Sequence, residues 1–207
     1  MISSLYTYEL GSCMLVGRMN PSIVMPRWLH ENKICRTPQV EFKIKIEPHG
    51  ISYIFEQDGF HWECSQTQLV VTSTDADNNP GAVVSKIIGL LTHTPVQACG
   101  NNFRYIISDQ ELQKSLGKRL LTSLRKDLLD LERDIIDSSI KYSISYSDAL
   151  IRTEFFHEED RVVALFFNFH RETQKASVAE KAADKWDSDK KASEELASDI
   201  LKGCTHV

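Results

Sequence analysis

Residues 91–105 bring together several side chains that could do chemistry. The segment reads LTHTPVQACGNNFRY and places five polar or reactive side chains around a proline and a glycine: His93, Cys99, Asn101, Asn102 and Arg104. A nucleophilic cysteine needs a lowered pKa, usually from a paired histidine or a helix N-terminus. Cys99 follows a predicted helix C-terminus and lies on a predicted strand. A catalytic Cys99–His93 pair therefore requires the chain to fold back at the intervening proline.

A structural interpretation of these residues competes with the catalytic one. Cys99 is then a buried free thiol, and His93 is a helix-terminal residue that interacts with exposed carbonyl groups. A third interpretation is a pocket between sheet and helices that binds a small molecule. The residues expected to line it are His93, Cys99, Asn101, Arg104, Arg152 and Glu154.

Arg152 and Glu154 share one face of a predicted strand, opposite the apolar residues between and beside them. If that face is in solvent, the two side chains form a surface pair that contributes little to stability. If helices cover the face, they form a buried polar pair and extend the pocket. The sequence leaves both alternatives open.

No metal ion or cofactor is predicted. His61 and Cys64 are three residues apart on a predicted strand, where such residues point to opposite faces and cannot chelate one ion. The hairpin tip at residues 157–160, His-Glu-Glu-Asp, has no supporting ligands and is expected to be solvated. Motifs of nucleotide-binding loops, serine hydrolases and zinc proteases are lacking.

Charge and hydropathy argue against two classes of partner. A formal net charge of −5 and a pI of about 5.8 disfavour nucleic acid, which selects basic surfaces. The sheet aromatics Tyr142, Tyr146, Phe155 and Phe167 lack the basic cluster of an RNA-binding platform. No apolar run approaches the ~18 residues that a membrane span requires. Membrane and nucleic-acid partners are therefore not expected.

The five cysteines favour a reducing compartment. Their number is odd, their spacings are wide and no CxxC pair occurs. The first residues also do not have the pattern of a secretory signal peptide. We therefore expect free thiols and a cytoplasmic location.

Alternation of apolar and polar residues predicts the strands, and turn residues such as Asp58-Gly59 separate them. The strand at 162–170 is apolar on both faces, which indicates a central position in the sheet. The predicted strands cover residues 3–18, 40–47, 51–57, 60–64, 68–73, 96–107, 140–146, 149–156 and 162–170.

Four helices are predicted, at residues 26–32, 82–93, 109–136 and from about 177 to 202. Ser108 and Glu111 have the spacing of a capping box, as do Ser177 and Glu180. Gly203 is expected to cap the last helix at its C-terminus.

The order of these elements predicts an α+β fold with an antiparallel sheet, or two apposed sheets, and helices on one face. A strand meander followed by a helix occurs twice. We expect one domain over residues 1–207, with pseudo-repeat halves at about 39–107 and 108–203, although the halves share no residue-level identity.

The absence of a catalytic motif favours a non-enzymatic function. Two long amphipathic helices and several strand edges would need covering, so the chain is expected to bind a protein partner or to form a homo-oligomer. The alternative is a small-molecule-binding protein or an enzyme with a pocket near residues 93–104.

Overall fold

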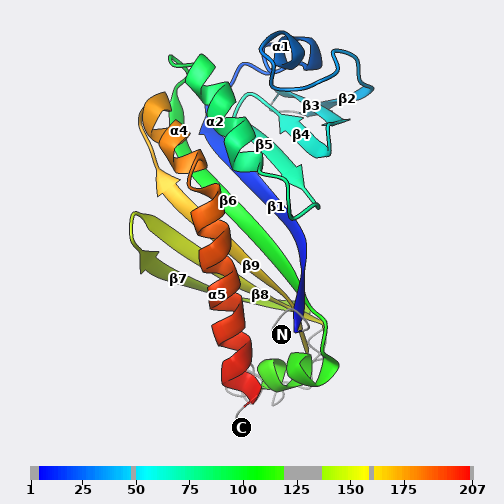
Figure 1. Ribbon diagram of the computed structural model, residues 1–207, viewed down its shortest axis with the longest axis vertical. Coiled ribbons are helices and arrows are strands. Elements are labelled where there is room, and N and C mark those ends of the chain that lie inside the picture. The colour runs from blue at the N-terminus through cyan, green and yellow to red at the C-terminus, as the bar shows by residue number, and fades with distance from the viewer. Residues whose placement is uncertain (1–4, 48–49, 119–136, 159–160, 206–207) are drawn as a thin grey trace. The chain divides into compact units, whose positions relative to one another are not determined.

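The computed structural model describes residues 5–47, 50–118, 137–158 and 161–205 of the chain. Within these residues, nine strands pair in the order β2-β3-β4-β5-β1-β6-β9-β8-β7 (Figure 1). The fold is α+β with an antiparallel sheet, which confirms the predicted class. Its strands are β1 (Tyr6–Gly17), β2 (Phe42–Glu47), β3 (Gly50–Gln57), β4 (Phe60–Cys64), β5 (Gln68–Ser73), β6 (Val96–Ile107), β7 (Asp137–Tyr146), β8 (Ala149–Glu158) and β9 (Arg161–Glu172).

The helices of the described chain are shorter or differently bounded than their sequence patterns suggest. They are α1 (Pro26–Glu31), α2 (Pro80–Leu90), α4 (Ala176–Ala183) and α5 (Trp186–Thr205), together with a helical segment over residues 110–118. The remainder of the helix predicted for 109–136 lies outside the described residues. None of the described helices is long and apolar enough to cross a membrane.

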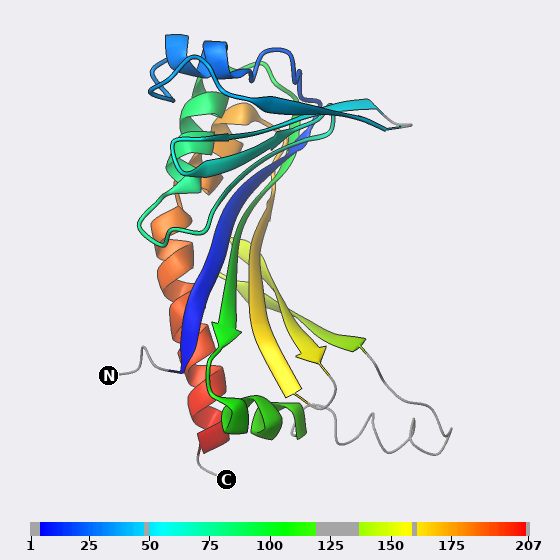
Figure 2. The ribbon, with the colours of Figure 1, turned by 90° about the vertical axis from the view of Figure 1, so that its right-hand side faces the viewer.

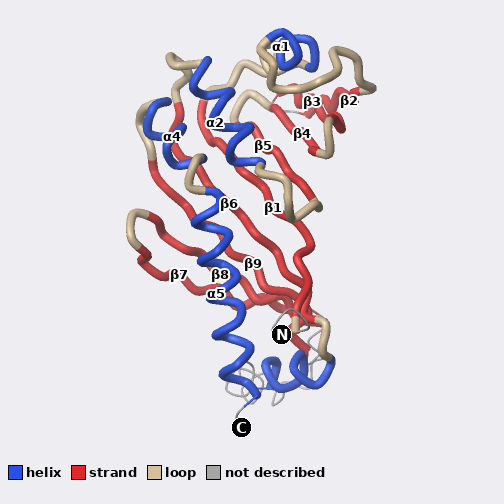
Figure 3. The backbone as a smooth tube through the Cα atoms, viewed as in Figure 1, coloured by secondary structure: helices blue, strands red, loops and turns tan. Residues whose placement is uncertain are grey.

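The long strands β1, β6 and β9 lie next to one another in the pairing order (Figure 3). β9 is buried on both faces, with Val162 and Ala164 on one side and Leu165, Phe167 and Phe169 on the other. This agrees with the central position predicted for that strand. The hairpin between β3 and β4 turns at Asp58 and Gly59, whose φ angles of 52° and 81° are those of a type I′ turn.

The chain forms two compact units from separated segments. Unit 1 comprises residues 1–9, 103–168 and 190–207, and unit 2 comprises residues 10–102 and 169–189. The elements β1, β6, β9 and α5 each run from one unit into the other. The contiguous halves predicted at 39–107 and 108–203 therefore describe the order of elements along the chain rather than these units.

In unit 2, α2 packs against α4 and against β5 (Figure 1). Pro80 occupies the first turn of α2, and the Asn79 side-chain oxygen accepts a hydrogen bond of 2.7 Å from the Ala82 amide. A Cβ atom on Gly81 would collide with the Ala183 carbonyl and with Trp186, so glycine allows the close approach. This cap and proline explain why α2 begins two residues before the predicted start.

In unit 1, the part of α5 from Lys190 onward lies along one face of the strands (Figure 2). The Tyr6 hydroxyl donates a hydrogen bond of 3.2 Å to the Glu194 carbonyl, and the Tyr105 hydroxyl lies 2.6 Å from that of Ser193. Tyr105 also contacts Tyr6 and Phe167 edge-on, with ring centroids 5.2 and 6.1 Å apart. These aromatic and polar contacts fix the helix on the sheet.

Both predicted capping boxes are wrong. The Asp109 carboxylate, rather than Ser108, accepts from the Leu112 amide at 2.9 Å, because Ser108 is still held by a backbone hydrogen bond to Leu5. The predicted final helix is divided at residues 184–185 into α4 and α5, and Lys175 precedes α4 without a side-chain cap. Gly203 lies within α5 and does not end it.

Candidate functional site

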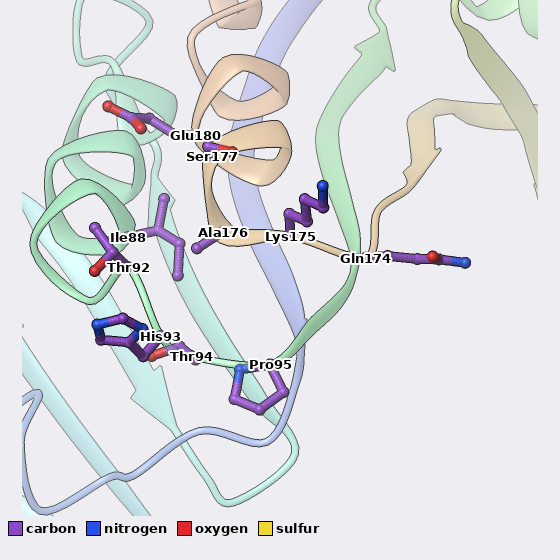
Figure 4. A pocket seen from close by; sticks show the side chains of 10 residues that line it. All are labelled: Ile88, Thr92, His93, Thr94, Pro95, Gln174, Lys175, Ala176, Ser177 and Glu180. Carbon is purple, nitrogen blue, oxygen red and sulfur yellow. The ribbon is translucent and has the colours of Figure 1, made fainter.

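A surface pocket of about 520 Å³ lies in unit 2 between the C-terminal end of α2 and the start of α4 (Figure 4). Its apolar residues include Ile88 and Ala176, and its polar residues include the predicted candidate His93. The residues that line it are Ile88, Thr92, His93, Thr94, Pro95, Gln174, Lys175, Ala176, Ser177 and Glu180.

Two short connections position the walls of this pocket. On one side the Thr94 amide donates to the Leu91 carbonyl, which forms the turn that carries His93 from α2 to β6. On the other side the Thr173 amide donates to the Gln97 carbonyl, and the chain then enters α4. His93 is exposed, and no hydrogen bond to its ring occurs within the described part of the chain.

The charged groups of the pocket do not converge on one point. The Lys175 side chain extends away from the loop that carries His93, and Glu180 projects from the far side of the opening (Figure 4). The start of α4 adds the positive end of a helix dipole near Lys175. The arrangement offers a shallow, mixed surface and lacks the base-and-nucleophile geometry of an active site.

Cys99 lies inside unit 2, against a second thiol. It is 1% exposed on β6, and a side-chain hydrogen bond joins it to the fully buried Cys13. Burial, followed by this contact with Cys99, raises the pKa of Cys13 well above its usual value. The structure therefore pairs Cys99 with Cys13, in agreement with its interpretation as a buried free thiol. His93 lies on the surface beyond the end of α2, without the predicted contact to helix carbonyl groups in the described part of the chain.

Asn101 joins a buried ionic cluster in unit 2. Its side-chain amide donates to the Asp189 carboxylate at 2.8 Å and to the Ala182 carbonyl at 3.2 Å. Arg171 donates to both oxygens of Asp189, at 2.7 and 2.8 Å, and the two side chains are 7% and 3% exposed. Such a bidentate arrangement satisfies the buried carboxylate and fixes the start of α5 on the sheet.

Neither Arg171 nor Asp189 was among the candidate residues. One sequence signal was available for Asp189, which lies three residues after Trp186 and four before Ser193, all on the buried stripe of α5. A carboxylate at such a position requires a buried partner. Its identity depends on the pairing of distant strands, which the sequence does not show.

Arg104 belongs to unit 1 and is half-buried there. Its Nε atom is 2.8 Å from an oxygen of Glu9, although the two atoms are not aligned for a hydrogen bond. The guanidinium also lies 4.9 Å from the centre of the Phe156 ring. Arg104 and Glu9 are 34% and 37% exposed, so the pair is partly screened by solvent.

Arg152 and Glu154 lie on the face of β8 opposite the buried residues Ile151 and Phe155. Glu154 pairs at 3.1 Å with Lys141, its direct cross-strand neighbour on β7. Arg152 is exposed and stands opposite Ser143 in the same ladder. This geometry matches the surface alternative, with Lys141 in place of Arg152 as the partner of Glu154.

The residues considered for metal binding are separated in the described structure. The His61 ring nitrogen lies 2.5 Å from Glu56, its cross-strand neighbour, whereas Cys64 is buried and its pKa is raised to about 12 by burial. Over the described residues, no group of three or more His, Cys, Asp and Glu side chains could hold a metal ion. The side chains of 157–160 lie outside the described part.

Most of the exposed large hydrophobic side chains of the described chain lie in the two edge hairpins of the sheet. Ten large hydrophobic side chains of the described chain are exposed, and eight of them belong to the hairpins that contain the edge strands β2 and β7. The β2–β3 patch consists of Phe42, Ile44, Ile46 and Ile51. The β7–β8 patch consists of Tyr142, Ile144 and Tyr146, with Leu150 on the opposite face.

No protein-family model matches the chain, and no curated protein matches it. The function therefore has to be inferred from the geometry of the chain itself.

Proposed function

We propose that this protein is a non-enzymatic, cytoplasmic interaction module that binds a partner protein, or a second copy of itself, through its sheet edges. The observation that carries this proposal is the concentration of exposed hydrophobic side chains on the two edge hairpins. Sheet edges present unpaired backbone groups, and a contiguous apolar patch beside them is typical of an interaction surface.

The exposed side chains continue the face that is buried further inside the sheet. Ile144 on β7 is 47% exposed, yet it stands directly opposite Ile151, which is 1% exposed. On β2, Phe42 is 43% exposed and stands opposite Phe55, which is 3% exposed. A partner that covered these positions would extend the same apolar layer and would gain about 25 cal/mol for each Å² of apolar surface buried.

The proposal assigns one binding edge to each predicted meander-plus-helix half, residues 39–107 and 108–203. It also fits a reducing compartment, since Cys13, Cys35, Cys64 and Cys99 are free thiols in the described structure. Burial raises the pKa of Cys35 and of Cys64 to about 12, which keeps both thiols protonated near neutral pH. They are therefore suited to packing rather than to nucleophilic chemistry.

Sedimentation velocity over a range of protein concentrations, with and without cell extract, tests this function. Glutamate at Ile44 and Ile46 should abolish association through β2, and glutamate at Tyr142 and Ile144 should abolish it through β7. Val178→Glu is the matched control, because Val178 is 47% exposed but lies on α4 and belongs to neither edge hairpin. A protein that remains monomeric throughout and retains no partner sensitive to these changes would contradict the proposal.

The second candidate function is that of a small-molecule-binding protein or enzyme that uses the pocket near residues 93–104. The start of α4 lies at this pocket, and the positive end of its helix dipole favours an anionic ligand. Thermal unfolding with inorganic phosphate, compared with chloride at equal ionic strength, tests it. Stabilisation that is lost in His93→Ala and in Lys175→Ala would support the pocket, and equal curves in both salts would exclude a phosphate site.

A further inference from the structure

β7 carries fewer of the devices that usually prevent strand addition at a sheet edge than β2 does, and its one lysine, Lys141, pairs with Glu154 of β8. Natural edge strands are blocked by lysines, prolines, bulges or short length. β2 has six residues, with Lys43 and Lys45 between its apolar side chains. β7 has ten residues, and the positions between Tyr142 and Tyr146 that alternate with the apolar side chains are both serine. In the described structure no strand pairs with its outer side.

From this edge we propose that β7 receives an extended peptide segment of another protein as an added strand. The segment carries alternating apolar residues on the Tyr142–Tyr146 face and an acidic residue on the other face, where Arg152 reaches it. This inference rests on the proposed interaction function and names its partner by chemistry. Strand addition derives affinity from main-chain hydrogen bonds and specificity from alternate side chains.

The apolar area exposed on β7 is large enough for a bound peptide but too small for a stable interface between two folded proteins. Tyr142, Ile144 and Tyr146 are 48%, 47% and 45% exposed. With side chains of about 200 Å² each, a partner would cover about 300 Å² here, or about 600 Å² over both partners. Stable protein dimers bury about 1,200–2,000 Å² in total. Pairing of two folded copies through this face alone falls short of that range.

The opposite face of the edge is positively charged and selects an acidic partner. Glu154 is paired with Lys141, and Arg152 makes no ion pair within the described structure. Arg152 stands across from Ser143, whose short side chain leaves room for the guanidinium to extend to a strand about 4.8 Å beyond β7. A carboxylate there can accept a bidentate hydrogen bond from the arginine.

The same charge disfavours a second copy of this chain in the central antiparallel register. Pairing of β7 with itself about Ser143 would place two Arg152 side chains on one face of the junction, each directed across a serine toward the other. Lys141 of each copy would then face Ser145 and would gain no acidic partner. Like charges placed together in this way destabilise strand pairing. An acidic peptide removes the repulsion and supplies the missing counter-charge.

Fluorescence anisotropy with three labelled peptides tests the inference. Each peptide matches the ten residues of β7 in length and alternates valine with glutamate, with lysine or with serine. The glutamate peptide should bind the full chain about tenfold more tightly than the lysine peptide, as one charge-assisted hydrogen bond requires. In Arg152→Ser the ratio should fall close to one, while binding of the serine peptide should not change.

Two matched variants separate β7 from the rest of the surface. Ile144→Asp should abolish binding of all three peptides, whereas Ile46→Asp, on the other edge, should leave it intact. Arg36→Ser removes an exposed arginine elsewhere and should preserve the preference for glutamate. Circular dichroism establishes that each variant is folded.

The outcomes also distinguish this inference from the proposed function. Equal binding of acidic and basic peptides, or no binding at submillimolar concentrations, overturns the assignment of an acidic strand to β7. If Tyr142→Glu still disrupts association of the whole protein in that case, the interaction function remains and only the peptide partner is wrong. If neither peptides nor partners depend on either edge, both proposals fail.

Discussion

Two arginine–carboxylate pairs show what burial does to the same chemistry. In unit 2, Arg171 and Asp189 are 7% and 3% exposed and form two aligned hydrogen bonds. In unit 1, Arg104 and Glu9 are 34% and 37% exposed and approach at one atom pair without alignment. The first pair is part of the interior, so loss of one partner leaves a buried charge, whereas the second pair is half-exposed and partly screened by solvent.

The comparison separates two candidate residues that are three positions apart on β6. Asn101 donates to Asp189 and belongs to the buried cluster, while Arg104 belongs to the surface pair. The segment 91–105, which contains most of the candidate residues, thus has two structural roles. Neither role requires a ligand.

Removing the buried carboxylate should have the largest effect. Asp189→Ala leaves the Arg171 charge buried without its counter-ion and should reduce the free energy of unfolding by about 3–5 kcal/mol. Urea titration followed by tryptophan fluorescence measures the change. The matched control is Asp184→Ala, at the exposed turn between α4 and α5, which should shift stability by less than about 0.5 kcal/mol. Equal effects of the two substitutions would mean that Asp189 is solvated in solution.

Alkaline pH should lower the free energy of unfolding, because unit 2 contains buried thiols. The expected effect is smaller than that of Asp189→Ala and larger than that of Glu9→Gln. Burial raises the pKa of Cys64 from 9.0 to about 12, so the unfolded chain loses this proton at lower pH than the folded chain does. The stabilisation is therefore complete below about pH 9 and is lost as pH rises toward about 12. Ionisation of the Cys64 thiol in the unfolded chain should by itself lower the free energy of unfolding by up to about 1.4 kcal/mol per pH unit in that window.

Urea titrations between pH 8 and 11 for the wild type and for Cys64→Ala check this expectation, since the slopes against pH should differ by about that amount. Parallel slopes would show that Cys64 ionises equally in the folded and unfolded chains. Cys35, whose pKa is likewise raised by burial, is unchanged in both proteins and cancels from the difference.

The surface pair should give the smallest effect. Glu9→Gln removes one charge from a partly exposed pair and should cost less than about 1 kcal/mol. A double-mutant cycle with Arg104→Gln should give a coupling energy within the same limit, and added salt should reduce it. A coupling energy as large as the effect of Asp189→Ala would show that the two pairs contribute equally to stability, despite their different burial.

Local patterns in the sequence were sufficient to predict where the strands lie along the chain, but not their order in the sheet. The strand predicted at 96–107 coincides with β6, because alternation and the preceding proline are local signals. The placement of β1 and β6 between the β2–β5 strands and β7–β9 depends on pairing between distant segments. The division between α4 and α5 was missed because residues 184–185, Asp-Lys, contain no helix breaker.

The candidate pair Arg152 and Glu154 shows the same limit at the level of side chains. Residues two apart on a strand share a face, but a direct cross-strand neighbour is closer. Lys141 holds that position opposite Glu154, and only the register of β7 against β8 reveals it. The sequence correctly identified the face of each residue and could not identify the partner.

Helix α5 also determines how late in translation the protein can complete its fold. Asp189 follows its partner Asn101 by 88 residues, and Ser193 follows its partner Tyr105 by the same number. Asn101 and Tyr105 therefore leave the ribosome long before the residues of α5 that they contact. Arg171 also precedes its counter-ion, Asp189, by 18 residues. Synthesis proceeds from the N-terminus, so a nascent chain holds both interiors open until α5 emerges. Folding of this protein is therefore expected to be completed late in translation.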